Sequence, residues 1–343
     1  MEENNTYTEL SALGEFALIE HLTKDIQLKN ASTLKGVGDD AALLNYGSKK
    51  ILVSTDLLIQ DIHFDLVYTP LTHLGYKAVA VNVSDICAMN GAAKQITVSI
   101  AVSNHFSVEG LDELYAGIYL ACEQYGIDLI GGDTCSSKSG LYISVTVLGE
   151  VDEKSITYRH TAKENQLICV SGNLGAAYMG LQLLEREKRV FTGQKDAPQP
   201  DFAGYEYILE RQLRPEARVG VVELLRGKNL TPTAMIDVSD GLSSDILQVC
   251  KASKIGCNLY EDKIPIDYQT FKMAEELNMN ATVCALSGGE DYELLFTLPI
   301  DKHELIATCE DIKIIGHTTQ ASEGCHLITG DGNSFELKAD SNL

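Results

Sequence analysis

Residues 72–90, THLGYKAVAVNVSDICAMN, predict a long helix in the first half of the chain. Its apolar residues recur near helical spacing: Leu74, Ala78, Val81 and Ile86. The flanking runs 51–55 and 96–102 are short, apolar and rich in β-branched residues, which predicts strands. A second helix is predicted at 108–125, and the apolar run 127–130 predicts a buried strand. Strands that alternate with helices indicate an α/β protein.

The same alternation continues through the rest of the chain. Further strands are predicted at 142–150, 167–170, 233–237 and 292–297, and further helices at 9–22, 176–187, 204–213, 215–227 and 239–253. Glycine, prolines and charges at 188–203 predict an exposed loop. The apolar strand at 142–150 gives way to the polar stretch Asp152-Glu153-Lys154-Ser155. We therefore expect two mixed α/β domains, 1–150 and 151–343, in the fold class α/β (α+β).

The composition excludes several classes of protein. The 343 residues include 27 basic and 49 acidic ones, a formal net charge of −22. This charge argues against binding to nucleic-acid phosphates and against a polybasic membrane anchor. No apolar run approaches the roughly 20 residues of a membrane-spanning helix. The polar, acidic start Met1-Glu2-Glu3-Asn4-Asn5 predicts no signal peptide.

Nine cysteines are spread along the chain, and no two of them form a C-x-x-C pair. Most lie in apolar runs, as Cys169 does between Ile168 and Val170. This pattern predicts reduced core thiols in a cytoplasmic protein, with neither a zinc site nor a disulfide framework.

Aspartates fall at the ends of the predicted strands or in the glycine turns after them: Asp39, Asp40, Asp56, Asp133, Asp237 and Asp240. Asp85 lies inside the largely apolar helix, three residues after Asn82 and on the same side. Each could be an ordinary turn residue, and Ser239 could be a helix N-cap with Asp240 in the first turn. If several converge, however, a cation must neutralise them. Oxygen-only ligands favour Mg²⁺ or Mn²⁺, with Ca²⁺ as a further alternative.

The familiar nucleotide-binding and nucleophile motifs are missing. The sequence contains no G-x-x-x-x-G-K-[ST] motif and no G-x-S-x-G motif, and Gly36-Val37-Gly38-Asp39-Asp40 does not continue as a Rossmann fingerprint. An acidic protein repels ATP, so metal ions would have to bridge carboxylates and phosphates.

Six blocks in order carry a resemblance to a known family: GVGDDAALL at 36–44, STD at 54–56 with His63-Phe64, KAVAVNVSD at 77–85, LIGGDT at 129–134, IDVSDGL at 236–242 and SGGEDYEL at 287–294. Together they resemble the thiamine-monophosphate kinases, over nearly the whole chain. One block alone would indicate only the wider superfamily of aminoimidazole ribonucleotide synthetase, selenophosphate synthetase and the hydrogenase-maturation dehydratase.

The resemblance implies an ATP-dependent phosphotransferase that converts thiamine monophosphate to thiamine diphosphate with release of ADP. It implies several Mg²⁺ ions held by Asp40, Ser54, Thr55, Asp56, Asp85, Asp133, Asp237 and Asp240. It implies ATP contacts from Gly132, Asp133, Arg159 and Ser239, and substrate contacts from His63 and Glu290. It further implies a cytoplasmic homodimer whose N-terminal domain dimerises through a β-sheet or barrel.

The acceptor chemistry agrees with this reaction. A phosphate monoester has a second pKa of about 6, so it is largely dianionic at pH 7 and needs no general base. The transfer instead requires that the repulsion between the two anionic phosphate groups is relieved and that they are placed in line. Bridging metal ions supply both. We therefore predict direct transfer without a phosphoenzyme.

Some positions depart from the family or allow other roles. The residues after Arg159 differ from the family's R-x-G-A-x-x-G-D pattern, and Ala339 stands about where the family has an aromatic residue. His63 could be a packed surface histidine, Arg159 a solvated charge, and Glu290 a ligand of its own turn's amides. The alternative functions are a superfamily enzyme with another acceptor and a non-catalytic protein that binds divalent cations.

Overall fold

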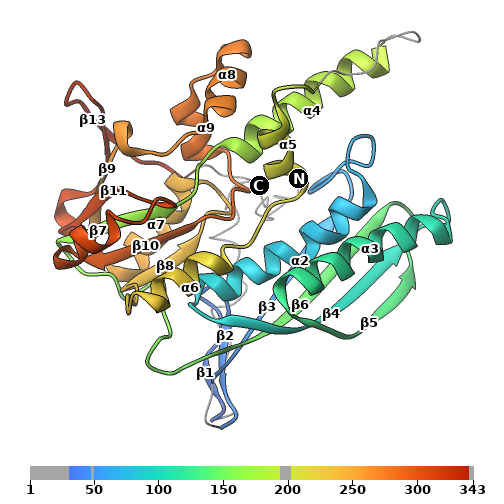
Figure 1. Cartoon of the computed structure of the whole chain (residues 1–343), viewed down its shortest axis with the longest axis horizontal. Helices are drawn as coiled ribbons and strands as arrows, with labels where there is room; N and C mark the ends of the chain where they lie inside the picture. Colours follow the sequence, from blue (N-terminus) through green and yellow to red (C-terminus); the bar gives the residue numbers. More distant parts are fainter. Residues whose placement is uncertain (1–30, 48–49, 194–201, 340–343) are drawn as a thin grey trace, which may run out of the picture.

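The computed structural model describes residues 31–47, 50–193 and 202–339, and its strands form two sheets. The N-terminal sheet has six strands in the order β1-β2-β3-β6-β4-β5 (Figure 1). Their bounds are β1 Thr33–Lys35, β2 Ala42–Asn45, β3 Lys50–Ile59, β4 Ala92–Val102, β5 Asp128–Ser136 and β6 Leu141–Val151. Within the described ranges β1 and β5 are free edges, so this sheet is open and not a closed barrel.

The C-terminal sheet has seven strands in the order β13-β12-β9-β11-β7-β10-β8. Its strands are β7 Gln166–Ser171, β8 Ala234–Asp237, β9 Gly256–Tyr260, β10 Leu294–Pro299, β11 Ile312–Thr319, β12 Cys325–Ile328 and β13 Ser334–Glu336. Its helices are α4 Ala176–Gly193, α5 Glu206–Leu213, α6 Val219–Gly227, α7 Leu242–Ser253, α8 Tyr268–Glu276, α9 Ala281–Ser287 and α10 His303–Ile306. Two mixed α/β units are thus confirmed, while the boundary at 150/151 stays a prediction.

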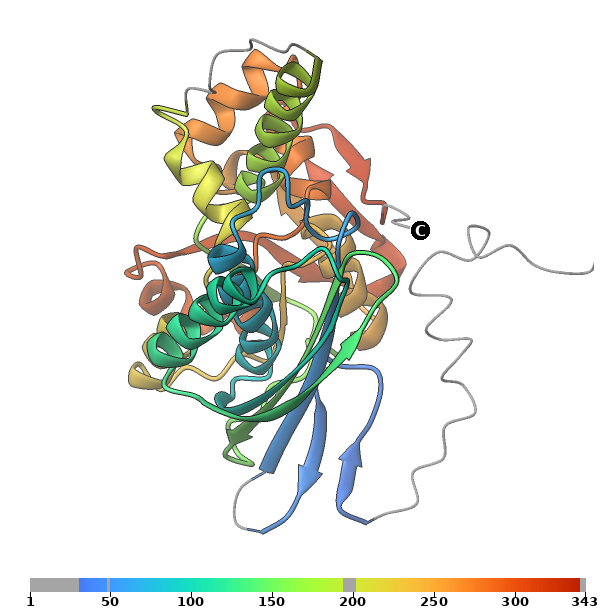
Figure 2. The same ribbon diagram turned by 90° about the vertical axis from the view of Figure 1, so that its right-hand side faces the viewer.

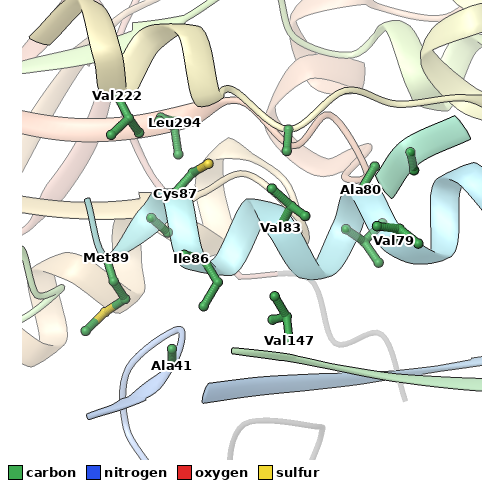
Figure 3. Close-up of a cluster of buried hydrophobic side chains, with 14 of the residues drawn as sticks. Ala41, Val79, Ala80, Val83, Ile86, Cys87, Met89, Val147, Val222 and Leu294 are labelled. Atoms are coloured by element: carbon green, nitrogen blue, oxygen red, sulfur yellow. The ribbon is translucent and has the colours of Figure 1, made fainter. Parts of the chain in front are cut away.

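Two helices, α2 (Leu71–Ala88) and α3 (Val108–Tyr125), cover one face of the N-terminal sheet (Figures 1 and 2). Nearly every residue of α2 from Leu74 to Ala88 is buried. Ile86 points toward the strand that carries Val147, whereas Val83 and Cys87 lie on the other side of the helix, where Val222 and Leu294 of the C-terminal unit lie near Cys87 (Figure 3). The helix therefore packs between both units, which places Asp85 at their junction.

Three local predictions were wrong, and one lies outside the described residues. The strand at 127–130 was expected to be buried, but β5 is an exposed edge strand in which Ile130 is 59% exposed. Residues 188–193 continue α4 and do not begin the loop predicted at 188–203; the charged Lys188 pairs there with Asp65. The helix predicted at 239–253 begins only at Leu242. The helix predicted at 9–22 falls in the undescribed segment. No described helix is long and apolar enough to cross a bilayer.

Candidate active site

Three aspartates from three different elements meet at the junction of the two units. Asp40 precedes β2, Asp85 lies in α2, and Asp237 ends β8. One carboxylate oxygen of each lies within 4.8 Å of the other two. The sequence separates these residues by up to 197 positions, so the two sheets must pack together before the site exists.

A cavity beside this cluster adds a fourth aspartate and a serine, and we call the cluster and the cavity together the acidic pocket. A cavity of about 130 Å³ is lined by Asp56, Asp85, Asp237 and Ser239, together with His63 and Glu290. Ser54 Oγ donates a hydrogen bond to Asp85 Oδ2, and Asp56 N donates to Asn82 Oδ1. Asn82 and Asp85 thus lie on one side of the helix, as predicted, and both contact residues of β3.

Burial and mutual repulsion disfavour ionisation of this cluster. Burial, followed by the neighbouring Asp237 and Asp39, raises the pKa of Asp40 to about 7, although Arg159 opposes the shift. Burial raises the pKa of Asp56 to about 6, and burial with repulsion from Asp56 and Asp240 raises that of Asp237 to about 6. The pKa of Asp85 is raised well above its usual range by burial and then by its three acidic neighbours. The Oδ2 atom of Asp40 is buried without a hydrogen-bond partner among the described residues. An all-oxygen donor set with an orphaned buried carboxylate oxygen fits Mg²⁺.

In metal-free protein we expect the free energy of unfolding to fall as the pH rises from about 4 to about 7. Since the pKa values of Asp40, Asp56 and Asp237 are raised, the folded state keeps protons that the unfolded state has lost over this interval. This stabilising protonation is complete below about pH 4 and lost above about pH 7. Mg²⁺ needs ionised carboxylates, so it should raise the unfolding temperature by several degrees at about pH 8 and much less at about pH 5. Thermal unfolding with chelator or excess Mg²⁺ measures the difference; an equal effect at both pH values contradicts it.

The turn after β8 leaves the Ser239 side chain available to the cavity. Ser239 is not the N-cap of α7, because Gly241, at φ +112°, occupies that position without a side-chain cap. Asp245 Oδ2 instead accepts hydrogen bonds from the backbone N–H groups of Asp240 and Gly241. The capping role proposed for Ser239 is therefore wrong, and Asp245 stabilises the turn that presents Ser239 and Asp240.

A serine in α2 supports the cluster and was missed in the sequence. Ser84 is buried, and its hydroxyl donates to Asp237 Oδ2 across the junction. A serine in the middle of an apolar helix was the only signal that could have indicated it.

Arg159 lies against the acidic pocket and is not a solvated charge. Its Nη2 is 3.0 Å from Asp40 Oδ1, and its backbone N–H donates to Asp39 Oδ1. Asp39 also contacts Lys35, and Arg159 Nε lies 3.7 Å from Asp39 Oδ1, so Arg159 contacts both neighbouring aspartates. Arg159 thereby holds the turn before β2 against the C-terminal unit.

The alternation of β3 separates Thr55 from its neighbours. Thr55 Oγ1 donates to Val145 O on the exposed face of the sheet, opposite the helices. Gly132 and Asp133 lie on β5. In the register of the sheet Gly132 is level with Asp56 of β3, but β5 is three strands away from β3, a distance of about 14 Å across the sheet. Within the part of a single chain that the structure describes, Thr55, Gly132 and Asp133 therefore do not reach the aspartate cluster.

His63 and Glu290 stand between the acidic pocket and a larger cavity. Both line the 130 Å³ cavity and a neighbouring one of about 550 Å³. His63 Nδ1 accepts a hydrogen bond from Ile59 N at 3.1 Å, which leaves Nε2 as the protonated nitrogen of the neutral ring. Glu290 Oε2 accepts from Lys77 Nζ at 2.7 Å rather than from the amides of its own turn. Lys77, a buried lysine in an apolar helix, is a residue of both cavities to which the sequence analysis gave no role.

The C-terminal end does not supply the family's missing aromatic residue. Phe335 is 57% exposed on β13, at the opposite edge of its sheet from β8 and the aspartates. Ala339 is also exposed.

Comparisons with known proteins place this chain in a family. The family model for the N-terminal domain of AIR synthase related proteins matches residues 38–151. The thiamine-monophosphate kinase of Bacillus subtilis (strain 168) is 36% identical over 333 residues, which cover 95% of this chain and 98% of that protein. The chain belongs to the thiamine-monophosphate kinase family. The sequence-based assignment to this family is thus confirmed.

Solved structures extend the likeness to the whole fold. The complex of AaThiL with AMPPCP and TMP matches with a TM-score of 0.83 and 30% identity, over 99% of this chain and 100% of that one. The hydrogenase maturation protein HypE in complex with ATP matches with a TM-score of 0.68 over 95% of each chain. At 19% identity, the match with HypE shows a common fold alone.

Proposed function

We propose that this protein transfers the γ-phosphate of ATP to thiamine monophosphate, giving thiamine diphosphate and ADP. The observation that carries the proposal is the junction of two cavities, one acidic and one large, at His63 and Glu290. A donor phosphate chain held over the carboxylates would face an acceptor seated in the larger cavity. Family membership supports this choice over a superfamily enzyme with another acceptor.

Asp40, Asp56, Asp85 and Asp237, with Asp240 and Ser54 beside them, would hold Mg²⁺. When bound, the ions neutralise the two phosphate chains and align them for in-line transfer. Ser54 and Ser84 orient two of the carboxylates by hydrogen bonds. The acceptor phosphate is already an anion, so none of these residues needs to remove a proton.

The larger cavity suits the cationic rings of the acceptor. Its lining includes the ring of Tyr68 and the carboxylates of Asp61, Asp65 and Glu185, of which the last two lie beside the ammonium group of Lys188. Tyr68 donates to Glu185 Oε1 at 2.9 Å, which fixes the ring. An acidic, partly aromatic wall favours a thiazolium cation, and Lys77 and His63 Nε2 at the junction favour its phosphate.

His63→Ala is expected to raise KM for thiamine monophosphate about tenfold or more, while KM for ATP stays the same. The reason is the loss of a hydrogen bond from Nε2 to a charged phosphate, which contributes about 1.5–3 kcal/mol. Steady-state kinetics with each substrate varied in turn measure the two constants. His105→Ala, at an exposed histidine distant in sequence, is the matched control. An equal rise in both KM values would contradict the assignment.

The remaining nucleotide contacts, Gly132 and Asp133, require a second copy of the chain in this proposal. They lie about 14 Å from Asp56 within one chain, on the free edge strand β5. The sheet face that carries Thr55, Leu57 and Asp133 is exposed. We propose a homodimer through this sheet, in which Asp133 of each chain completes the site of its partner. Arg159 and Ser239 would contact ATP from the chain that supplies the aspartates.

Mixed dimers test this arrangement. Asp133→Asn and Asp85→Asn homodimers are both expected to be inactive. A mixed dimer of the two variants would hold one intact site and show about half the wild-type activity per dimer. If Asp133 served its own chain's site, every site would carry one defect and no activity would return. Two differently tagged chains, co-expressed and purified through both tags, supply the sample.

The reaction itself is tested by ADP release from ATP and Mg²⁺ with thiamine monophosphate added or omitted. We expect ADP in equal amount to new thiamine diphosphate, identified by chromatography, and none without the acceptor. Folded, Mg²⁺-loaded protein that forms no thiamine diphosphate would contradict the proposal. It would favour a sister enzyme with another acceptor, or a protein that only binds cations.

The need for ATP and the reduced cysteines favour the cytoplasm as the location of the protein.

A further inference from the structure

Three cysteine thiols meet in the C-terminal unit, away from the aspartates. Cys250 lies near the end of α7, Cys257 in β9 and Cys325 at the start of β12. The three Sγ atoms all lie within 4.8 Å of one another. Two of the residues are buried, and Cys325 is half-buried.

The fold itself brings these thiols together. Strands β9 and β12 are parallel, and Cys257 pairs directly with Cys325, so both side chains leave the sheet on the same face. The thiol of Cys250 meets them from α7. Spacings of 7 and 68 residues carry no metal-site signature, which is why the sequence analysis predicted no zinc site.

We propose that Cys250, Cys257 and Cys325 bind one thiophilic metal ion, of the chemical class of Zn²⁺. Zinc bonds to thiolate sulfur at about 2.3 Å, and tetrahedral ligands at that distance lie about 3.8 Å apart. The observed spacing therefore needs at most about 1 Å of contraction. A disulfide would use only two of the three thiols, whereas one metal ion can bind all three. Because Cys325 is only half-buried, we assign the fourth position of the tetrahedron to a water molecule that enters from its side.

Metal binding replaces the thiol protons, which leave to solvent, and no electron is transferred.

The ion would join the C-terminal segment to α7. Leu337 N donates to Cys325 O at 2.9 Å, and Ser243 Oγ donates to Lys338 O at 2.6 Å. Since α7 follows the turn that presents Ser239 and Asp240, the ion would stabilise the scaffold of the candidate active site from behind. The proposal stands independently of the reaction that the site carries out.

The test uses full-length protein, reduced and handled without oxygen, with excess Mg²⁺ present to occupy carboxylate sites. After incubation with Zn²⁺ or Cd²⁺ and passage over a weak chelator, elemental analysis measures the retained metal. We expect one equivalent in wild type and in Cys135→Ser, where an exposed cysteine outside the cluster is changed. We expect Cys325→Ser to retain less than a tenth of an equivalent, and only proteins with the three cysteines to show the Cd²⁺–thiolate ultraviolet band.

Alkylation of wild type keeps the proposal testable if Cys325→Ser fails to fold. Zn²⁺ should slow the labelling of Cys325 at least tenfold by mass spectrometry, whereas the excess Mg²⁺ alone should not slow it. The proposal is overturned if wild type retains no more metal than Cys325→Ser, if Zn²⁺ does not slow the labelling of Cys325, or if two of the three cysteines are found as a disulfide in the anaerobic sample.

Discussion

Asp85→Asn is expected to lower kcat by about a thousandfold or more in a protein that stays folded. Asp85 lies within 4.8 Å of Asp40 and Asp237, and an amide cannot replace its negative charge as a metal ligand. Asparagine has the same shape, and its side-chain oxygen can still accept the hydrogen bond from Ser54. Steady-state ADP release at saturating Mg²⁺ and both substrates measures kcat.

The stability of the same variant separates a catalytic from a structural role. In metal-free protein Asp85 is repelled by Asp56, Asp237 and Asp40, so its neutralisation should leave the unfolding temperature equal or higher. A cation-binding protein without catalysis would instead lose mainly its stabilisation by Mg²⁺. Asp112→Asn, the same change at an exposed site in α3, is expected to alter neither quantity. Activity within tenfold of wild type would contradict the role of Asp85.

Glu293→Ala is expected to destabilise the protein by about 3–5 kcal/mol, because it leaves two arginines without their buried partner. Glu293 is fully buried, and its carboxylate pairs with Arg211 of α5 at 3.0 Å and with Arg218 before α6. Ser171 of β7 donates to the same carboxylate. One side chain therefore connects the central strands of the C-terminal sheet to two helices.

Chemical unfolding of the variant, monitored by far-ultraviolet circular dichroism, measures the loss. Asp301→Ala is the matched control, since Asp301 pairs with Lys302 at an exposed position and should change stability by less than about 0.5 kcal/mol. A loss below about 1 kcal/mol for Glu293→Ala would show that the arginines find other partners. Arg211 also donates to the carbonyl of Asp291, so we expect loss of Glu293 to disturb the neighbouring turn at Glu290 as well.

Much of the fold could be predicted from local patterns. The helix at 108–125 was predicted with the bounds that the structure shows, and the one at 72–90 to within two residues at each end. These segments carry their signal in side-chain periodicity and in end residues such as Ser107, which caps α3. The strand at 127–130 was predicted to be buried, which is wrong, because an apolar run has the same composition in an exposed edge strand as in a buried one.

The candidate site could be predicted as a set of residues but not as a geometry. The motifs indicated the aspartates, His63 and Glu290, yet not that Lys77 pairs with Glu290 or that Ser84 supports Asp237. The motifs also did not show that Thr55 lies on the opposite face of the sheet from Ser54 and Asp56. That depends on the register of β3 and on which face of the sheet the helices cover.

The sequence by itself determined the family, the order of helices and strands, and the acidic character of the site. These depend on periodicity, turn chemistry and short motifs, each contained within a few neighbouring residues. Only the tertiary structure decided that Asp40, Asp85 and Asp237 share one pocket, that Gly132 and Asp133 stand apart, and that three distant thiols meet. Such convergence depends on strand order, register and the packing of two sheets around α2, which are long-range interactions that no local pattern records.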